Sequence, residues 1–202
     1  MITIIDYGLG NLASVRNMIK KVGGESQISK DPDAIRKAEK LILPGVGAFG
    51  VGMKNLIDSG LQEAIKENTA QGTKLMGICL GAQLLTNHSE ENDVNGLGLI
   101  AAQTKKFNLT DPQLKVPHMG WFNIALDQAN HPLLQNLQDN PRYYFVHSYY
   151  MHCDNAANQL CSCTYEHPFS AGIVQDNVAG FQFHPEKSHV FGMRIIENFI
   201  NW

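Results

Sequence analysis

The sequence lacks the long hydrophobic runs and the one-sided charge that mark membrane and nucleic-acid-binding proteins. No stretch approaches the roughly 18 consecutive apolar residues of a transmembrane helix. The first residues, MITIIDYGLG, have neither the basic start nor the apolar core of a signal peptide. Lys and Arg number 16 against 19 for Asp and Glu, which leaves a net charge of −3 and no electrostatic footprint for nucleic acid. We therefore expect a cytoplasmic protein that binds neither membranes nor nucleic acids.

Cysteines are few, and their placement does not resemble a secreted disulfide framework. The chain has four of them, Cys79, Cys153, Cys161 and Cys163. Three lie near His152, so a metal site is one alternative. However, Cys161 and Cys163 alternate along an expected strand, where small buried thiols are common. We expect no metal and no cofactor.

The 202 residues, of which 44% are hydrophobic and 17% charged, suit an α/β fold with a substantial core. The first half alternates expected strands with expected helices. The strands are at 2–6, 25–29, 41–43 and 74–78, and the helices are at 12–22, 33–38, 53–71 and 80–87. This order predicts a doubly wound, mostly parallel sheet.

The second half has a different pattern, which predicts an antiparallel extension of that sheet. Short extended segments are expected at 99–104, 123–126 and 143–146, followed by a hairpin of 172–175 with 179–183 and a closing helix at 191–200. No repeat or linker divides the chain, so we expect a single domain over residues 1–202.

Three glycine-rich loops follow the expected parallel strands, and such loops meet at one edge of a sheet, where ligands bind. Two of them, at 8–13 and 45–50, match the dinucleotide fingerprint G-x-G-x-x-G/A. The second strand has no acidic residue at its end to hold a ribose, which disfavours dinucleotide binding.

The third loop, GICLG at 77–81, is a cysteine version of the nucleophile elbow. Its glycines permit a tight turn between strand and helix, and the helix N-terminus favours the thiolate form of Cys79. The N–H of Leu80 can stabilise an oxyanion in the same space. Taken alone, the loop also fits a core cysteine in a glycine-rich turn.

A histidine with a neighbouring acid lies near the other end of the chain. FQFHPE at 181–186 places His184 directly after an alternating strand, with Glu186 two residues on. A carboxylate in that position can orient the imidazole and fix its tautomer. Cys79, His184 and Glu186 therefore form a candidate set of nucleophile, base and orienting acid. A non-catalytic, flavodoxin-like nucleotide-binding module would instead leave Cys79 inert.

These residues carry a family resemblance. KLMGICLGAQLL at 74–85 and FQFHPEKS at 181–188 resemble the class I glutamine amidotransferases, whose triad is Cys-His-Glu. Four further motifs resemble, more narrowly, the glutaminase subunits of imidazole glycerol phosphate synthase. They are DYGLGNLASV at 6–15, LPGVGAFG at 43–50, VPHMGW at 116–121 and YFVHSYY at 144–150. The motifs cover nearly the whole chain, and the resemblance implies the flavodoxin-like fold of that family.

The resemblance also implies a role for particular residues. Cys79 would attack the carboxamide of L-glutamine, and His184, oriented by Glu186, would protonate the departing ammonia. The oxyanion hole would come from Val46, Gly47 and Leu80. The glutamine-binding residues would be Gly45, Gln83, Ser148 and Tyr149, and those at the partner interface Asn11 and Trp121.

The implied partner is a (β/α)8-barrel cyclase that forms a heterodimer with the glutaminase and uses its ammonia for imidazole glycerol phosphate synthesis in histidine biosynthesis. One alternative is a paralogous glutaminase that feeds a surface-polysaccharide sugar amidotransferase. A second is a stand-alone hydrolase of γ-glutamyl peptides. Phe122 and residues 188–192 depart from the family pattern, and we expect them on the partner-facing surface, where the first two pathways would differ.

Overall fold

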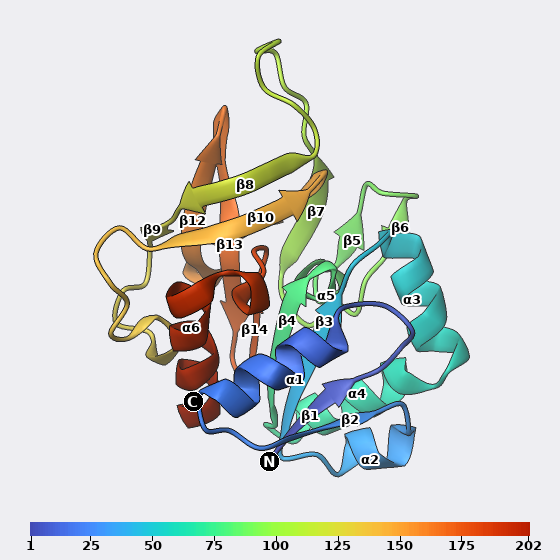
Figure 1. Ribbon diagram of the computed structural model, residues 1–202. Coiled ribbons are helices and arrows are strands. Elements are labelled where there is room, and N and C mark those ends of the chain that lie inside the picture. Colours follow the sequence, from blue (N-terminus) through green and yellow to red (C-terminus); the bar gives the residue numbers. More distant parts are fainter.

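The computed structural model describes residues 1–202, which form one large sheet flanked by helices and a second, two-stranded sheet (Figure 1). The helices are α1 (Leu12–Lys21), α2 (Pro32–Arg36), α3 (Phe49–Asp58), α4 (Leu61–Ala70), α5 (Leu80–Leu84) and α6 (His189–Asn201). The strands are β1 (Ile2–Ile5), β2 (Ser26–Ser29), β3 (Lys40–Gly45), β4 (Lys74–Cys79), β5 (His88–Ser89), β6 (Val94–Asn95), β7 (Ala102–Lys106), β8 (His118–Asn123), β9 (Ala125–Leu126), β10 (Arg142–His147), β11 (Tyr149–Cys153), β12 (Gln159–Tyr165), β13 (His167–Gln175) and β14 (Val178–Phe181).

The large sheet has a parallel half and a largely antiparallel half. Its strand order is β2-β1-β3-β4-β14-β13-β11-β7-β5-β6, with β12 beside β13 and β9 beside β12. The run from β2 to β14 is parallel throughout, and from β13 on most pairs are antiparallel. β3 and β4 are buried almost throughout, which explains their continuous apolar sequences. The predicted α/β architecture with an antiparallel extension is confirmed.

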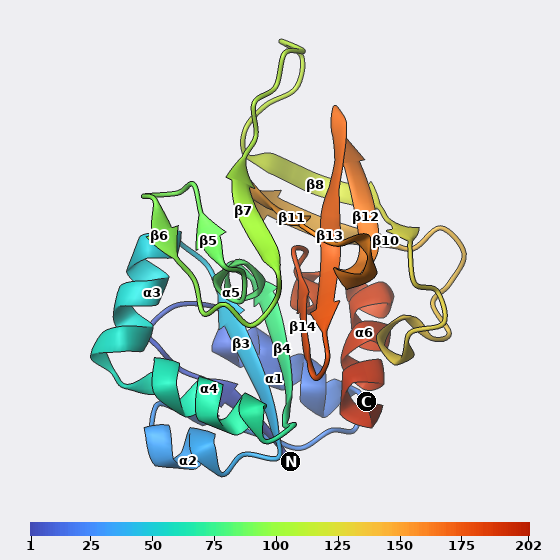
Figure 2. The same ribbon diagram turned by 180° about the vertical axis from the view of Figure 1, so that it is seen from behind.

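Helices cover both faces of the parallel half (Figures 1 and 2). On one face, α1 and α6 pack against the sheet through residues such as Val15, Ile19 and Ile195. On the other face, α2 to α5 pack through Ile35, Leu56 and other apolar residues. Each helix turns one apolar stripe to the sheet, so two hydrophobic cores share it.

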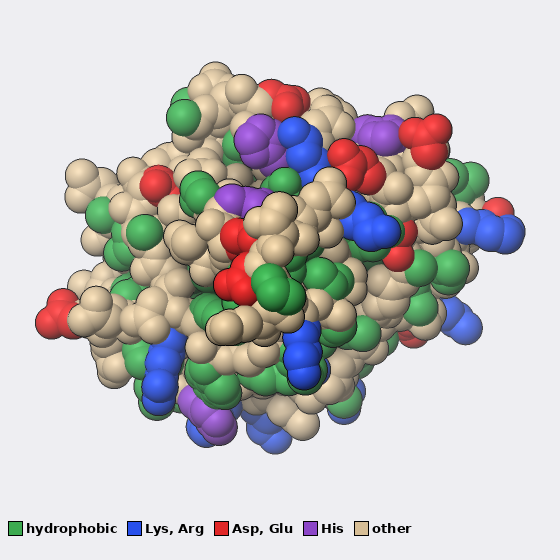
Figure 3. Space-filling view, turned by 90° about the horizontal axis from the view of Figure 1, so that it is seen from above, with side chains coloured by type: hydrophobic (Ala, Val, Ile, Leu, Met, Phe, Trp, Pro, Cys, Tyr) green, Lys and Arg blue, Asp and Glu red, His purple; other side chains and the backbone are tan.

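The small sheet forms a second layer over the antiparallel half of the large sheet. It consists of β8 and β10, which pair in antiparallel orientation. The predicted hairpin is present between β13 and β14, with Asp176 at φ 53° in its turn. Seen from above, acidic, basic and apolar side chains are intermixed, and the basic ones form no continuous surface on that face (Figure 3). No helix combines the length and the apolar character needed to cross a membrane.

Some predicted helix boundaries were wrong. The single helix expected at 53–71 is two helices, since Gly60 adopts a left-handed φ of 72° and starts α4 in a new direction. The helix expected at 80–87 ends at Leu84 because Leu85 and the following residues enter turns. β8 ends at Asn123, where the extended segment expected at 123–126 begins. Its extent is set by pairing with β10, which is distant in sequence.

Candidate active site

Cys79 lies on a sharp turn between β4 and α5. Its backbone has φ 54° and ψ −111°, a conformation that residues with a side chain rarely adopt. The flanking glycines are required by close packing. A Cβ at Gly77 would lie 2.6 Å from Ala82 Cα, and a Cβ at Gly81 would overlap the carbonyl oxygen of Leu43. The sequence therefore places the thiol at the carboxyl edge of the parallel strands, directly before a helix N-terminus.

His184 follows β14 and lies beside Cys79, from which it is separated by most of the C-terminal half of the chain. Its backbone is fixed to β10, because its N–H donates to Tyr144 O at 3.0 Å. Ser188 Oγ donates to His184 O at 2.6 Å and accepts from Tyr144 N at 3.0 Å. The imidazole Nδ1 pairs with Glu186 Oε1 at 2.7 Å, and both side chains are buried. The segment thus holds the imidazole in one orientation.

The neighbours of His184 determine its charge. Burial on its own lowers the pKa of His184, but its interactions with Cys79 and Glu186 outweigh burial and raise the pKa to about 9. Nδ1 is hydrogen-bonded to Glu186, so only Nε2 is available to exchange a proton with a substrate. Nε2 is buried and has no hydrogen-bond partner. The group can therefore carry a proton at neutral pH and direct it away from Glu186, as an acid–base catalyst must.

A cavity of about 220 Å³ opens in front of Cys79. Most of the site residues predicted from the sequence line it, namely Val46, Gly47, Cys79, Leu80, Gln83, Ser148 and Tyr149. His184 and Glu186 do not line it and lie buried behind. Gly45 is also outside the lining, and a Cβ there would collide with the Tyr7 hydroxyl. The structure thus gathers residues from four separate stretches of chain at one edge of the sheet.

Two polar residues of the lining were missed by the sequence analysis, Glu91 and His147. Glu91 comes from the turn after β5, and its Oε2 accepts from Phe49 N at 2.8 Å, which satisfies the N-terminus of α3. No local pattern marks such a residue. No acid directly follows His147 in the sequence, and its partners are His118 and the carbonyl of Tyr149.

The residues expected at the partner interface lie on two elements. Asn11 caps α1, with its side chain accepting from Ser14 N at 3.2 Å. Trp121 on β8 is 39% exposed, and its indole is stacked on His189 with 5.5 Å between ring centroids.

Two residues expected on the partner-facing surface are turned inward. Phe122 packs on His118 with 4.0 Å between centroids, because alternation along β8 points it away from the exposed face of Trp121. Ser188 is fully buried at the hydrogen bonds that hold His184.

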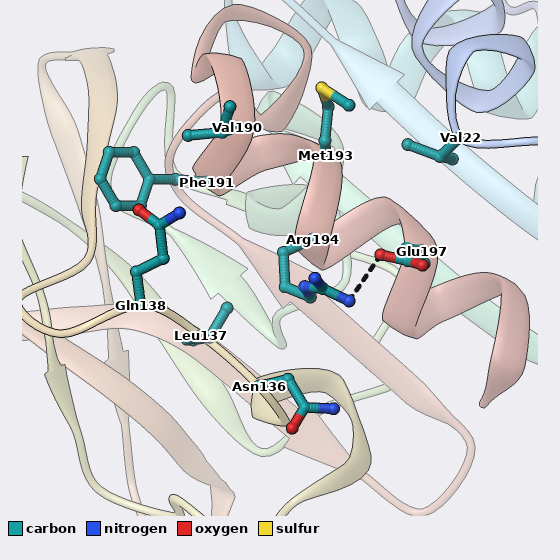
Figure 4. Close-up of a pocket in the computed structure, with 9 residues that line it drawn as sticks. All are labelled: Val22, Asn136, Leu137, Gln138, Val190, Phe191, Met193, Arg194 and Glu197. Carbon is teal, nitrogen blue, oxygen red and sulfur yellow. Dashed lines mark hydrogen bonds and ion pairs between the residues drawn. The ribbon is translucent and has the colours of Figure 1, made fainter.

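A larger cavity, of about 320 Å³, lies away from this site between α6, the end of α1 and residues 136–138 (Figure 4). Its wall includes Val22, Leu137 and Phe191. The charged residues there, Arg194 and Glu197, pair with each other at 2.7 Å. None of the predicted catalytic, oxyanion-hole or glutamine-binding residues lines this cavity, so its size does not make it the better candidate for the chemistry.

Comparisons with known proteins show the family of the chain. The family model for class I glutamine amidotransferases matches residues 3–202. The chain is 51% identical to imidazole glycerol phosphate synthase subunit HisH 2 of Methanococcus maripaludis over 99% of this chain and 98% of that protein. It is 49% identical, with the same coverage, to the HisH 2 subunit of Pseudomonas aeruginosa.

Solved structures add a likeness of fold. PurLQS from Thermotoga maritima aligns with a TM-score of 0.77 at 17% identity, covering 99% of this chain and 97% of that one. A crystal structure of a glutamine amidotransferase aligns with a TM-score of 0.74 at 16% identity, covering 100% of this chain and 98% of that one. The chain therefore belongs to the class I glutamine amidotransferase family, within the group of HisH subunits of imidazole glycerol phosphate synthase.

Proposed function

We propose that the chain hydrolyses L-glutamine to glutamate and ammonia, with Cys79 as nucleophile, His184 as acid and base, and Glu186 as the group that orients His184. One observation carries the proposal: a strained elbow cysteine lies beside a buried histidine–carboxylate pair, next to an open cavity. In that pair, His184 Nδ1 is 2.7 Å from Glu186 Oε1. Backbone strain at a reactive side chain is typical of catalytic sites. An inert core cysteine would need neither the strain nor the pair.

In the first half of the reaction, the Cys79 thiolate attacks the carboxamide carbon of glutamine. The carbonyl π electrons move to oxygen, which becomes an oxyanion. When the intermediate collapses, the carbon–nitrogen bond breaks and His184 Nε2 gives its proton to the departing amine, so ammonia leaves. The product on the enzyme is a γ-glutamyl thioester of Cys79.

In the second half, a water molecule attacks the thioester carbon while His184 Nε2 accepts one of its protons. The carbon–sulfur bond then breaks, glutamate leaves and the thiolate is restored. The backbone N–H of Leu80 and the Val46–Gly47 turn, which line the cavity beside the thiol, are proposed to stabilise the oxyanion in both halves.

Glutamine is proposed to bind in the 220 Å³ cavity through one acidic side chain and several neutral polar groups. Glu91 is the acidic side chain in the lining, so it offers the countercharge for the α-ammonium group. Polar groups of Gln83, Ser148 and Tyr149 would hold the rest of the substrate. Gly45 would contribute by leaving the elbow room to form, since a Cβ there would lie 2.8 Å from Gly81 N and 2.9 Å from Leu80 Cβ.

The ammonia is proposed to pass to a (β/α)8-barrel cyclase subunit in a heterodimer, for imidazole glycerol phosphate synthesis in histidine biosynthesis. The names of the relatives, which denote synthase subunits, support this proposal. Asn11 and Trp121 are the proposed docking residues. Met119 and Val116, which are 62% and 46% exposed, add apolar surface on and beside β8. We propose that all 202 residues act as one domain, because both hydrophobic cores share one sheet.

The proposal is tested by mixing the chain with the histidine-pathway cyclase and its nucleotide substrate, and by measuring glutamate release. We expect a complex, low activity of the isolated chain and stimulation of about 100-fold in the loaded complex. Absence of both complex and stimulation, with an alkylatable Cys79, would favour the polysaccharide paralogue. Full activity without any partner would favour the stand-alone γ-glutamyl hydrolase.

A further inference from the structure

A pair of buried histidines lies beside the cavity and has no part in the proposed chemistry. His118 begins β8 and His147 ends β10, and the two face each other across the strand pair. Their Nδ1 and Nε2 atoms are 2.9 Å apart. His147 lines the cavity, whereas His118 does not reach it and lies fully buried among aromatic rings, including Phe122 and Tyr165.

The hydrogen bonds of this pair run in one direction. Burial lowers the pKa of both histidines well below the ordinary value, so both are neutral at physiological pH. His147 Nδ1 lies 2.7 Å from the carbonyl oxygen of Tyr149, which can only accept, so Nδ1 carries the hydrogen. His147 Nε2 is then an acceptor, and His118 Nδ1 must donate to it. His118 Nε2 has no partner, which makes His118 the start of the chain of donors.

The chain of donors ends on the backbone that forms one wall of the cavity. The bond from His147 to Tyr149 O spans Ser148, which joins β10 to β11. Gln83 Nε2 donates to the same carbonyl at 2.9 Å, so that oxygen is held from two sides. The other hydrogen of Gln83 Nε2 is donated to Gln182 Oε1 at 3.0 Å. Three lining residues, Gln83, Ser148 and Tyr149, are therefore fixed relative to each other.

We propose that His118 and His147 are positioning residues for the substrate: their donor chain fixes the bend at Ser148 and with it the glutamine-binding wall. The inference rests on the proposed function for the identity of the substrate. His118 acts only through His147, because it does not reach the cavity itself. The surrounding aromatic rings exclude competing water and so strengthen both hydrogen bonds. His184 and Glu186 are held by Tyr144, by Ser188 and by each other. Cys79 is joined to the donor chain only through Gln182 Nε2, which lies 3.9 Å from its Sγ, so the pair affects substrate binding more than turnover.

The test uses His118→Leu, which removes the donor, and His118→Asn, whose amide keeps an N–H near the position of Nδ1. Glutamine hydrolysis is measured in the complex with cyclase and nucleotide. We expect His118→Leu to raise KM about tenfold with kcat changed less than about twofold, and His118→Asn to restore KM to within about threefold. An unchanged KM in His118→Leu, an equal defect in both variants, or a loss confined to kcat would overturn the proposal.

A second variant tests whether His118 acts through His147. In a His147→Leu background, adding His118→Leu should raise KM by less than about twofold, because the acceptor of its hydrogen bond is already gone. Independent effects that multiply would contradict this. The rate of Cys79 alkylation by iodoacetamide should be the same in all variants, and a parallel fall in that rate would show a general loss of structure instead of a positioning role.

A measurement on the unmodified chain does not depend on any variant folding. Long-range ¹H–¹⁵N NMR should show both imidazoles neutral at pH 7 with the hydrogen on Nδ1, and a hydrogen on His147 Nε2 would overturn the direction of the donor chain. Failure of the proposed function is distinguishable, because it would appear in the unmodified chain, as no complex and no stimulation or as full activity without a partner. Failure of the present inference would appear only in the variants or in the positions of the imidazole hydrogens.

Discussion

Two buried histidines flank Cys79, and their surroundings give them opposite properties. Burial alone lowers the pKa of both His184 and His147. Beside His184 lie a carboxylate and a thiol, and its pKa rises to about 9. Beside His147 lies another imidazole, and its pKa falls far below the ordinary value. Burial is the largest cause that lowers the pKa of either imidazole, and only His184 has neighbours that outweigh it.

The difference divides the work of the site between two regions. The His184 region, on the turn after β14, can hold and transfer a proton at neutral pH. The His147 region, between β10 and β11, can only hold a fixed pattern of neutral hydrogen bonds. Changes at the first should therefore reduce turnover, and changes at the second should reduce affinity for glutamine.

The largest effect is expected from Cys79→Ala and His184→Ala. Each should reduce glutamine hydrolysis at least about a thousandfold, because nucleophile and base act as a unit. Cys79→Ala removes only a sulfur at a turn, so circular dichroism and binding of the cyclase should be unchanged. Substantial ammonia release by the Cys79→Ala variant would refute the assignment of the nucleophile.

A smaller effect is expected from Glu186→Ala, of about a hundredfold in kcat. An orienting group is more replaceable than a base. The pKa of His184 should also fall, since one interaction that raises it is lost while burial remains. Glu186→Gln serves as the control, because its amide oxygen can still accept from Nδ1. A Glu186→Ala variant with unchanged kcat would remove Glu186 from the mechanism.

The pKa of His184 itself should fall in Cys79→Ala, because the thiol contributes to raising it. Titration of the imidazole signals by NMR measures this without any turnover. The pKa of His147 should move much less in the same variant, since its shift is caused chiefly by burial and then by His118, while the charge of His184 is the smallest of its causes. Equal shifts at both histidines would mean that the two regions are not electrostatically separate.

The smallest effect is expected on stability, and the two regions should act in opposite pH windows. The contribution of His184, whose folded pKa is raised, is present below about pH 6.5 and lost as pH rises through 9. The contribution of His118 and His147, whose folded pKa values are lowered, is present above about pH 6.5 and lost on acidification. Each proton changes the free energy of unfolding by at most about 1.4 kcal/mol per pH unit.

Urea unfolding at a series of pH values gives the free energy of unfolding as a function of pH. Its fall at low pH is called the acid limb, and its fall at high pH the alkaline limb. His118→Leu combined with His147→Leu should flatten the acid limb and leave the alkaline limb intact, and His184→Ala should do the reverse. If one substitution flattened both limbs, the separation into two windows would be wrong.

The sequence predicts those parts of the site that are encoded locally. GICLG marks the elbow because Gly77 must leave room for Ala82, five residues on, and His184 with Glu186 stand two residues apart. The need for Gly81 has a distant cause, because its close contact is with Leu43 on β3. The strand–helix order also predicts the parallel half of the sheet. These features depend on backbone preferences and spacing, which a single sequence contains.

Features that depend on distant partners could not be predicted. Glu91 enters the cavity from a turn, and His118 meets His147 only because β8 and β10 pair in that register. The same register turns Phe122 inward, since a shift by one residue would reverse every side chain of the strand. The break at Gly60 was missed because the apolar pattern continues through it.

Trapping the covalent intermediate shows whether Cys79 is the nucleophile. The complex with cyclase and nucleotide is mixed with glutamine, quenched in acid and digested, and its cysteine peptides are analysed by mass spectrometry. We expect one γ-glutamyl group on the peptide that contains Cys79 and none on the peptides of Cys153, Cys161 and Cys163, which serve as internal controls. Steady hydrolysis with Cys79 unmodified, or an adduct on another cysteine, would contradict this assignment.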